Sequence, residues 1–208
     1  MVSEKLNALC EDWTKQLDDV QAERRLILNR IIDYIVSEHA TSGNVQLVYI
    51  CTHNSRRSHF GQVLSALAAA YFNLDWIQTF SGGTEATAFH PNAIEALRSV
   101  GFDIEPMDES SNPKYKVQFG DGLMSICFSK VYDDEVNPKS RFAAIMTCSD
   151  AEENCPFIPG VSLKVATTYA DPKAFDGTEL QAQMYLERCQ QIGVECLYVF
   201  HEVAKRLN

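Results

Sequence analysis

The chain has 208 residues, of which 46% are hydrophobic and 22% are charged, and its formal net charge is −10. This length suffices for one substantial core but is short for two full domains. The negative charge argues against a general nucleic-acid binder and against a protein that lies on anionic membranes. No apolar run approaches ~18 residues and the N-terminus has no signal-peptide core, so we expect a cytoplasmic protein without a membrane span.

Seven cysteines form an odd set without a disulfide pattern, which favours a reducing compartment and reactive rather than structural thiols. Two pairs, Cys148 with Cys155 and Cys189 with Cys196, are each seven residues apart. This spacing is longer than the two to four residues that typically separate zinc-binding cysteines, and no close histidine completes a ligand set. We therefore expect no metal and no other cofactor.

The first section of the chain, residues 4–38, predicts two helices because its apolar residues recur at helical spacing. Gly43 lies in the turn that follows. The two helices are interpreted as a hairpin that packs against the rest of the chain or joins two copies of it as a homodimer.

Residues 45–72 predict a buried strand, a polar loop and a helix. The strand is the apolar run 45–50, and the helix follows from the apolar spacing that begins at Phe60. Residues 51–58 between them are polar except for Cys51. A loop from a strand to a helix N-terminus collects anions in α/β folds, because unpaired backbone N–H groups and the helix dipole converge there.

The residue types of this loop suit a nucleophile beside an oxyanion site. Nearby cations and a helix N-terminus favour the thiolate form of Cys51. Arg57 can hold two oxygens of a tetrahedral anion through its planar fork. Ser58 can donate a hydrogen bond to the thiolate, and Asn54 and Ser55 can stiffen the loop. The alternative, a core cysteine with a solvated arginine, does not explain why so many polar residues follow the strand.

The middle of the chain predicts further α/β elements. Residues 76–80 resemble a second strand, and residues 91–100 a helix with Pro91 at its first position and Gly101 at its end. His90, at the start of this helix, is interpreted as structural rather than catalytic. Around Gly120, two strand patterns flank a turn and predict a β-hairpin, with Cys127 in the core.

The last third of the chain predicts strands over 142–147 and 161–168 and then a C-terminal helix. This helix carries Cys189 and Cys196, with an interruption at Gly193 left open. On a continuous helix, residues seven apart are about 10.5 Å apart along the axis, whereas a disulfide requires Cα atoms within about 7 Å. Cys189 and Cys196 are therefore interpreted as buried packing thiols.

The loop sequence CTHNSRRS (51–58) resembles the signature loop of the low-molecular-weight protein tyrosine phosphatase superfamily, and its CTHNS start is most similar to the arsenate reductases of that superfamily. The stretch SGGTEATAFHPNAIEALRSVGFDI (81–104) resembles the same superfamily. The resemblance implies a three-layer α/β/α fold with flavodoxin-like winding and a four-stranded parallel sheet. Against the family pattern, 1–43 is an N-terminal helical extension, and 44–208 is the α/β domain with an inserted hairpin at about 112–138 along the sheet edge.

The resemblance also implies roles for individual residues. Asp171, which precedes Pro172 after the last strand, corresponds to the general acid of the superfamily. Arg56 is a departure, because family loops usually carry a small or apolar residue there. The catalytic residues implied are Cys51, Arg57, Ser58, Asp171, Cys148 and Cys155, and the oxyanion-binding residues are Thr52, His53, Asn54, Ser55, Arg56 and Arg57.

Cys148 and Cys155 are similar in place and spacing to the second and third cysteines of thioredoxin-coupled arsenate reductases. Reduction of arsenate takes two electrons, which a lone thiolate cannot supply catalytically. A second thiol must attack the arsenylated first one, and a third moves the resulting disulfide to where a reductant reaches it. Such a relay implies thioredoxin or another dithiol protein as partner.

Three functions follow from these patterns. The first is reduction of arsenate to arsenite. The second is hydrolysis of phosphotyrosine or of a small phosphate ester, although Lys173 and Ala174 stand where phosphatases often carry aromatic residues. The third is oxyanion binding or redox sensing without turnover. The first two need a small oxyanion substrate, and none needs nucleic acid or a membrane.

Overall fold

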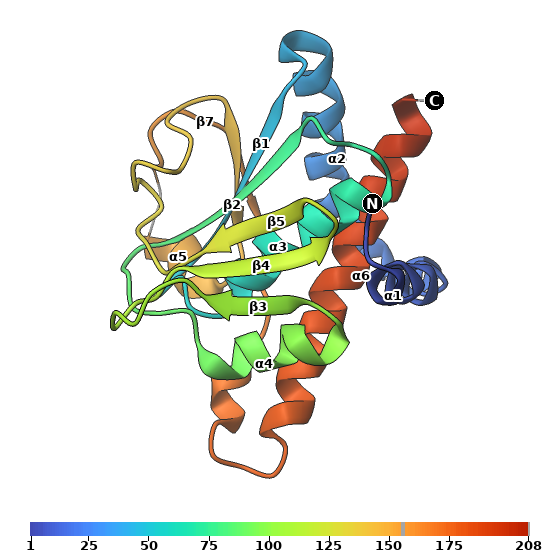
Figure 1. Ribbon diagram of the computed structural model, residues 1–208. Helices are drawn as coiled ribbons and strands as arrows, with labels where there is room; N and C mark the ends of the chain where they lie inside the picture. The colour runs from blue at the N-terminus through green and yellow to red at the C-terminus, as the bar shows by residue number, and fades with distance from the viewer. Residues whose placement is uncertain (155–156, 208) are drawn as a thin grey trace.

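The computed structural model describes residues 1–154 and 157–207, which are shown in Figure 1. Four parallel strands form the central sheet in the order β2-β1-β6-β7. The expected four-stranded parallel sheet is confirmed. Its strands are β1 (Val45–Cys51), β2 (Ile77–Gly83), β6 (Phe142–Met146) and β7 (Val161–Ala166).

The two faces of β1 explain the layers. Side chains alternate along a strand, so Leu47 and Tyr49 enter one buried cluster while Val48 and Ile50 enter another on the opposite face. A strand buried on both faces consists of apolar residues almost throughout, as the sequence of β1 does. Strand β1 is thus one of the two internal strands of the sheet, and its carboxyl end opens onto the loop from Cys51.

Helices cover both faces of the sheet. On one face α2 (Ala22–Ser42), α3 (Arg57–Tyr71) and α6 (Gln181–Leu207) pack together, with α1 (Glu4–Thr14) and α4 (Pro91–Val100) against α6. On the other face, α5 (Ser149–Asn154) packs on β1 and β6. Two short 3₁₀ turns are η1 (Leu17–Asp19) and η2 (Pro172–Phe175). The predicted three-layer α/β/α architecture is confirmed.

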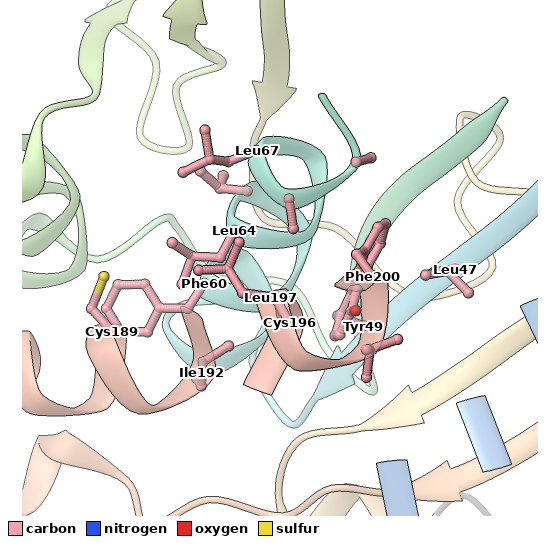
Figure 2. Close-up of a cluster of buried hydrophobic side chains, with 14 of the residues drawn as sticks. Leu47, Tyr49, Phe60, Leu64, Leu67, Cys189, Ile192, Cys196, Leu197 and Phe200 are labelled. Carbon is pink, nitrogen blue, oxygen red and sulfur yellow. The ribbon is translucent and has the colours of Figure 1, made fainter. Parts of the chain in front are cut away.

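The main core lies where α3 and α6 cross above β1. Figure 2 shows Phe60 and Leu64 of α3 facing Ile192 and Leu197 of α6, beside Tyr49 of β1. All five are at most 6% exposed. This packing fixes the first turn of α3, and so the loop before it, against the sheet.

The α6 helix is continuous through Gly193. A Cβ atom at this position would overlap the ring of Trp13, which α1 presses against α6. Glycine thus allows a close approach of two helices and does not interrupt the helix.

The predicted hairpin is confirmed, and it lies beside the β2 edge of the main sheet without joining that sheet. Its strands, β4 (Tyr115–Gly120) and β5 (Leu123–Cys127), join β3 (Asp103–Pro106) in a separate antiparallel sheet. The inward residues Ile104, Val117 and Phe119 are buried in the main core. Strand alternation therefore directs the sheet onto the helical layer, and Val131, after β5, meets the edge of β2 through one isolated bridge to Gly83.

The two N-terminal helices are also confirmed. They contribute Leu6, Trp13, Ile32 and Ile35 to the same core as α3 and α6, so they pack within the chain. Among the described helices, none combines the length and the apolar character needed to cross a bilayer.

Candidate active site

The loop from β1 to α3 is fixed by the side chain of Asn54. This residue has φ 43°, a left-handed backbone that asparagine tolerates better than most residues. Its Oδ1 accepts the Lys130 backbone N–H at 2.9 Å, and its Nδ2 donates to Ser58 Oγ at 2.9 Å. Asn54 is fully buried, so these bonds hold the centre of the loop in one conformation.

The segment after β2 forms one wall of the loop. Ser55 Oγ donates to the Ala88 carbonyl at 2.8 Å, and its own carbonyl accepts the His90 N–H at 3.0 Å. Gly83 lies so close that a Cβ atom there would be 2.6 Å from the Thr52 carbonyl oxygen. Only glycine allows this approach of the two segments.

Cys51 lies at the end of β1, where the loop turns towards the first turn of α3. Its Sγ is 3.0 Å from Ser58 Oγ, and the residue is 4% exposed. The orphan N–H groups of a helix N-terminus favour negative charge. The hydroxyl group of Ser58 and the N-terminal end of the α3 dipole are therefore both directed towards Cys51 Sγ.

The three side-chain nitrogens of Arg57 differ in their hydrogen-bond partners. Nη1 donates to the Tyr169 carbonyl at 2.9 Å, and Nη2 donates to Asp171 Oδ2 at 2.6 Å. Nε is buried and has no hydrogen-bond partner among the described residues. A buried donor without a partner is costly, and an oxyanion oxygen is the kind of acceptor that a guanidinium fork binds.

Asp171 is positioned by the turn it begins. Its Oδ1 accepts the Lys173 backbone N–H at 3.0 Å, which makes it the N-cap of η2, and Pro172 follows at the first position. The remaining oxygen, Oδ2, is directed to Arg57. A carboxyl group therefore lies beside the cation of the loop.

Arg56 binds to a second cluster of side chains, which the sequence did not predict. Its Nε donates to Tyr185 Oη at 2.6 Å and its Nη2 to Asp176 Oδ2 at 3.2 Å. Asp176 Oδ1 accepts from Tyr185 at 2.8 Å and from Asn92 Nδ2 at 3.2 Å. We call Arg56, Asn92, Asp176 and Tyr185 the Asp176 cluster. The only sequence signal for it was the departure from the family pattern at Arg56.

The Asp176 cluster is charged and half-buried. Burial would raise the pKa of Asp176, but the hydrogen bond from Tyr185 and the charge of Arg56 outweigh this effect and lower the pKa. His90 lies 3.8 Å from Asp176, and burial together with Arg56 lowers its pKa. His90 Nδ1 accepts the Asn92 backbone N–H, so this histidine caps α4 as the sequence indicated.

The remaining loop side chains lie at the rim. His53 Nε2 is 2.8 Å from a carboxylate oxygen of Glu85, and the side chain of His53 is 45% exposed. Thr52 Oγ1 is 3.5 Å from Cys148 Sγ. The loop thus contacts the segment that follows β6.

Cys148 follows β6 and is 1% exposed. Its Sγ also accepts the Ala151 backbone N–H at 3.4 Å, at the start of α5. Because β1 and β6 are adjacent and parallel, their carboxyl ends bring Cys51 and Cys148 into one buried cluster. Cys155 lies outside the described residues.

Cys189 and Cys196 are buried on α6 and unpaired, which confirms their interpretation as packing thiols. Burial raises the pKa of Cys196 to about 12 and that of Cys189 well above the ordinary range. Within residues 1–154 and 157–207, no group of three or more His, Cys, Asp or Glu side chains could hold a metal ion.

Comparisons with known proteins identify the family, although no family model matches the chain. Arsenate reductase 2 of Staphylococcus epidermidis is 30% identical over 135 residues, which cover 65% of this chain and 84% of that protein. The chain belongs to the arsenate reductase family. The arsenate reductase of Bacillus subtilis is 26% identical over 162 residues, covering 78% of this chain and 99% of that protein.

Solved structures agree with this family at the level of the fold. An arsenate reductase in the phosphate binding state aligns with a TM-score of 0.52 at 18% identity, covering 76% of this chain and 98% of that one. A low-molecular-weight phosphotyrosine phosphatase from Vibrio cholerae O395 aligns with a TM-score of 0.54 at 13% identity, over 76% and 96% of the two chains. This arsenate reductase family member therefore has the low-molecular-weight phosphatase fold.

The structure brings most of the site residues inferred from the sequence to one end of the sheet. The group around the loop comprises Cys51, Thr52, Asn54, Ser55, Arg57, Ser58, Cys148 and Asp171. Two loop side chains are paired elsewhere, His53 with Glu85 and Arg56 with the Asp176 cluster.

Proposed function

We propose that this member of the arsenate reductase family reduces arsenate to arsenite through a relay of cysteine thiols. The observation that carries the proposal is the pair of thiols at the carboxyl ends of β1 and β6, with Thr52 of the loop in contact with Cys148. Hydrolysis of a phosphate ester would need only one nucleophile, Cys51. Reduction of arsenate takes two electrons, and a second buried thiol beside the loop can supply them together with Cys51 by forming a disulfide.

Arsenate is proposed to bind in the loop from Thr52 to Arg57, where backbone N–H groups and the helix dipole favour an anion. The buried Arg57 Nε, which has no partner among the described residues, supports this placement. Arg56 is proposed to contribute to this site through its backbone N–H, because its guanidinium is hydrogen-bonded to Tyr185 and Asp176.

In the first step, the Cys51 thiolate attacks the pentavalent arsenic and forms a sulfur–arsenic bond. Asp171 takes up a proton when arsenate replaces it on Arg57 and then gives this proton to one arsenate oxygen, which leaves as water. Ser58 donates to the sulfur before the attack, at the 3.0 Å separation seen here.

In the second step, the Cys148 thiolate attacks Cys51 Sγ. The sulfur–arsenic bond breaks, its electron pair stays on arsenic, and arsenite leaves while a Cys51–Cys148 disulfide forms. Cys155 is proposed to attack Cys148, which restores the Cys51 thiol and leaves a Cys148–Cys155 disulfide. A dithiol protein, for which thioredoxin is our candidate, then reduces this disulfide and completes the cycle.

Two further expectations concern the setting of the enzyme. The six described cysteines are unpaired, which fits a reducing compartment such as the cytoplasm. A homodimer through α1 and α2 stays a prediction. Their buried residues pack within the chain, while Leu26 of α2 is 70% exposed and is the side chain we would place in such an interface.

The decisive experiment couples the enzyme to thioredoxin, thioredoxin reductase and NADPH, and follows arsenate-dependent NADPH consumption. Wild type is compared with Cys148→Ser and with the control Cys189→Ala, and aryl-phosphate hydrolysis is followed in parallel. We expect arsenate turnover in wild type and in the control, and its loss in Cys148→Ser with any hydrolysis retained.

Two results would contradict the relay. Aryl-phosphate hydrolysis that Cys148→Ser leaves intact, without arsenate turnover in wild type, would make the protein a phosphatase. Phosphate binding without either activity would make it an oxyanion-binding or redox-sensing protein.

A further inference from the structure

A groove of about 990 Å³ lies between the two sheets, outside the loop from Cys51. Figure 1 shows β5 beside β2, with α3 behind them. Each of these strands is an edge strand with a neighbour on one side only, β1 for β2 and β4 for β5. The groove therefore has two strand edges as its walls and part of α3 as its floor. Its lining includes Ala66, Ala69, Phe80, Met124, Ile126 and Lys130.

The groove is apolar along most of its length. On α3 it is lined by Gln62 and by Ala66, Ala69 and Ala70, and the small alanine side chains leave the space open. Of the ten large hydrophobic side chains that are exposed in the described chain, four line this groove: Met1, Met124, Ile126 and Val136. Exposed apolar side chains gathered at one place mark a binding surface more often than scattered ones do.

Two ammonium groups lie at one end of the groove, on the ring of Phe128. Lys130 Nζ is 4.6 Å and Lys114 Nζ 5.3 Å from the ring centroid. This is the end at which the chain after β5 meets β2, through the bridge between Val131 and Gly83. The acidic residue in the lining, Asp75, precedes β2 and so lies towards the opposite end.

Lys130 is a buried amine on which the carboxylate of Asp134 acts only from beyond ion-pair distance. The residue is 4% exposed, and its ammonium has one long hydrogen bond, to the Phe128 carbonyl at 3.5 Å. No ion pair within 4.0 Å involves Lys130 among the described residues. A buried charge is costly unless it is paired, so the groove lacks an anion at this end.

We propose that this groove binds a small amphipathic carboxylate. Its carboxylate pairs with the ammonium groups of Lys130 and Lys114, and its alkyl or aryl chain lies along the alanines of α3 between Phe80 and Ile126. The cavity volume is in the range of small-molecule sites, and an apolar lining with a few polar anchors is their usual composition. Arsenate has no apolar part, so this site is distinct from the proposed function.

The test uses decanoate as the probe and decanol as its neutral match, with binding measured by titration calorimetry without arsenate or reductant. Wild type is compared with Lys130→Met, which keeps the apolar stem, and with Lys116→Met as a control on β4 outside the groove. We expect saturable decanoate binding to wild type and to Lys116→Met, and an affinity lower by at least about tenfold in Lys130→Met. Decanol should bind more weakly than decanoate.

A second variant, Ala66→Phe, fills the floor of the groove without touching either lysine. It should abolish decanoate binding while circular dichroism and arsenate turnover stay as in wild type, which separates blocked binding from misfolding. Absence of saturable decanoate binding to wild type, or equal binding of decanol and decanoate, would overturn the proposal. Concentration-dependent self-association that protects Met124 and Ile126 from solvent would also overturn it, in favour of a second copy of the chain as occupant.

Discussion

The guanidinium of Arg57 donates to the carboxylate of Asp171 across 2.6 Å, so the proposed oxyanion-binding cation already holds an anion of its own. The Arg57 side chain is 10% exposed and that of Asp171 34%, so water reaches the pair from the carboxylate side only. An incoming arsenate must share this guanidinium with Asp171. The ion pair therefore bears on both substrate affinity and proton transfer.

Replacing Asp171 by Asn is expected to tighten oxyanion binding and slow turnover. The substitution keeps an N-cap for η2 but removes the competing negative charge and the transferable proton. The dissociation constant for phosphate, a non-reducible analogue, should fall several-fold in calorimetry, while arsenate turnover falls by about 10²-fold or more. The exposed acid Glu135, changed to Gln, serves as the control. Weaker phosphate binding in Asp171→Asn would show that the carboxylate aids rather than opposes the anion.

The Asp176 cluster is expected to make stability depend on pH. Because the pKa of Asp176 is lowered in the folded protein, its ion pair stabilises the fold at neutral pH, and this contribution is lost as the pH falls below the ordinary aspartate pKa of about 4. Asp176→Asn should therefore lower the free energy of unfolding at pH 7 and lower it by less at pH 3. Urea unfolding at both pH values measures this difference, with the exposed Asp103→Asn as control. An effect of equal size at both pH values would exclude the charge as its cause.

The cluster is also expected to position the turn that carries Asp171, because Asp176 directly follows η2. Tyr185→Phe removes one donor to Asp176 and one acceptor of Arg56. We expect it to lower kcat more than it raises KM for arsenate, since it displaces the proton donor rather than the loop. Combination with Arg56→Met should be non-additive by more than about 0.5 kcal/mol in the activation free energy, as for residues in contact. Strict additivity would place the two residues in separate roles.

Gly193→Ala is expected to destabilise the fold by about 1–3 kcal/mol, as overpacking of a core usually does. The added methyl group overlaps the Trp13 ring and pushes α1 away from α6. Urea unfolding measures the loss, with the exposed Gln183→Ala on the same helix as control. Trp13→Phe in the Gly193→Ala background should recover part of the stability, because the smaller ring leaves room. A neutral Gly193→Ala would show that α1 adjusts without cost.

The cysteines are expected to differ sharply in alkylation by iodoacetamide at neutral pH. Burial raises the pKa of Cys10, Cys127 and Cys196 to about 12, so these thiols should stay unmodified in the folded protein. Cys51, with the Ser58 hydroxyl and the start of α3 beside it, should react, and phosphate should slow its reaction by occupying the loop. Peptide mass spectrometry after timed alkylation, with unfolded protein as reference, gives the rates. A Cys51 as unreactive as Cys196 would support an oxyanion-binding protein without turnover.

Local patterns in the sequence predicted the elements around the loop, because the strand ending at Cys51 and the helix that follows are encoded by adjacent residues. The partners of Arg56 were not predictable in this way. Tyr185 is 129 positions away, and no periodicity links a tyrosine on one helix to an arginine before another. Alternation likewise indicated that Cys127 of the hairpin is buried, but not that β4 pairs with β3. The sequence left open whether Gly193 interrupts the C-terminal helix. The structure shows instead that glycine makes room there for the ring of Trp13.

The end of the hairpin also supports the loop from Cys51. Ser129 Oγ donates to the His53 carbonyl at 2.9 Å, and the Lys130 backbone N–H donates to Asn54 at 2.9 Å. Any engineered change to the hairpin must therefore keep the two residues after Phe128, as well as Val117 and Phe119, whose side chains are buried in the main core. A loop transplanted from this chain into a relative without Ser129 and Lys130 would lose two of its hydrogen bonds, so the loop and this junction have to be exchanged as one unit.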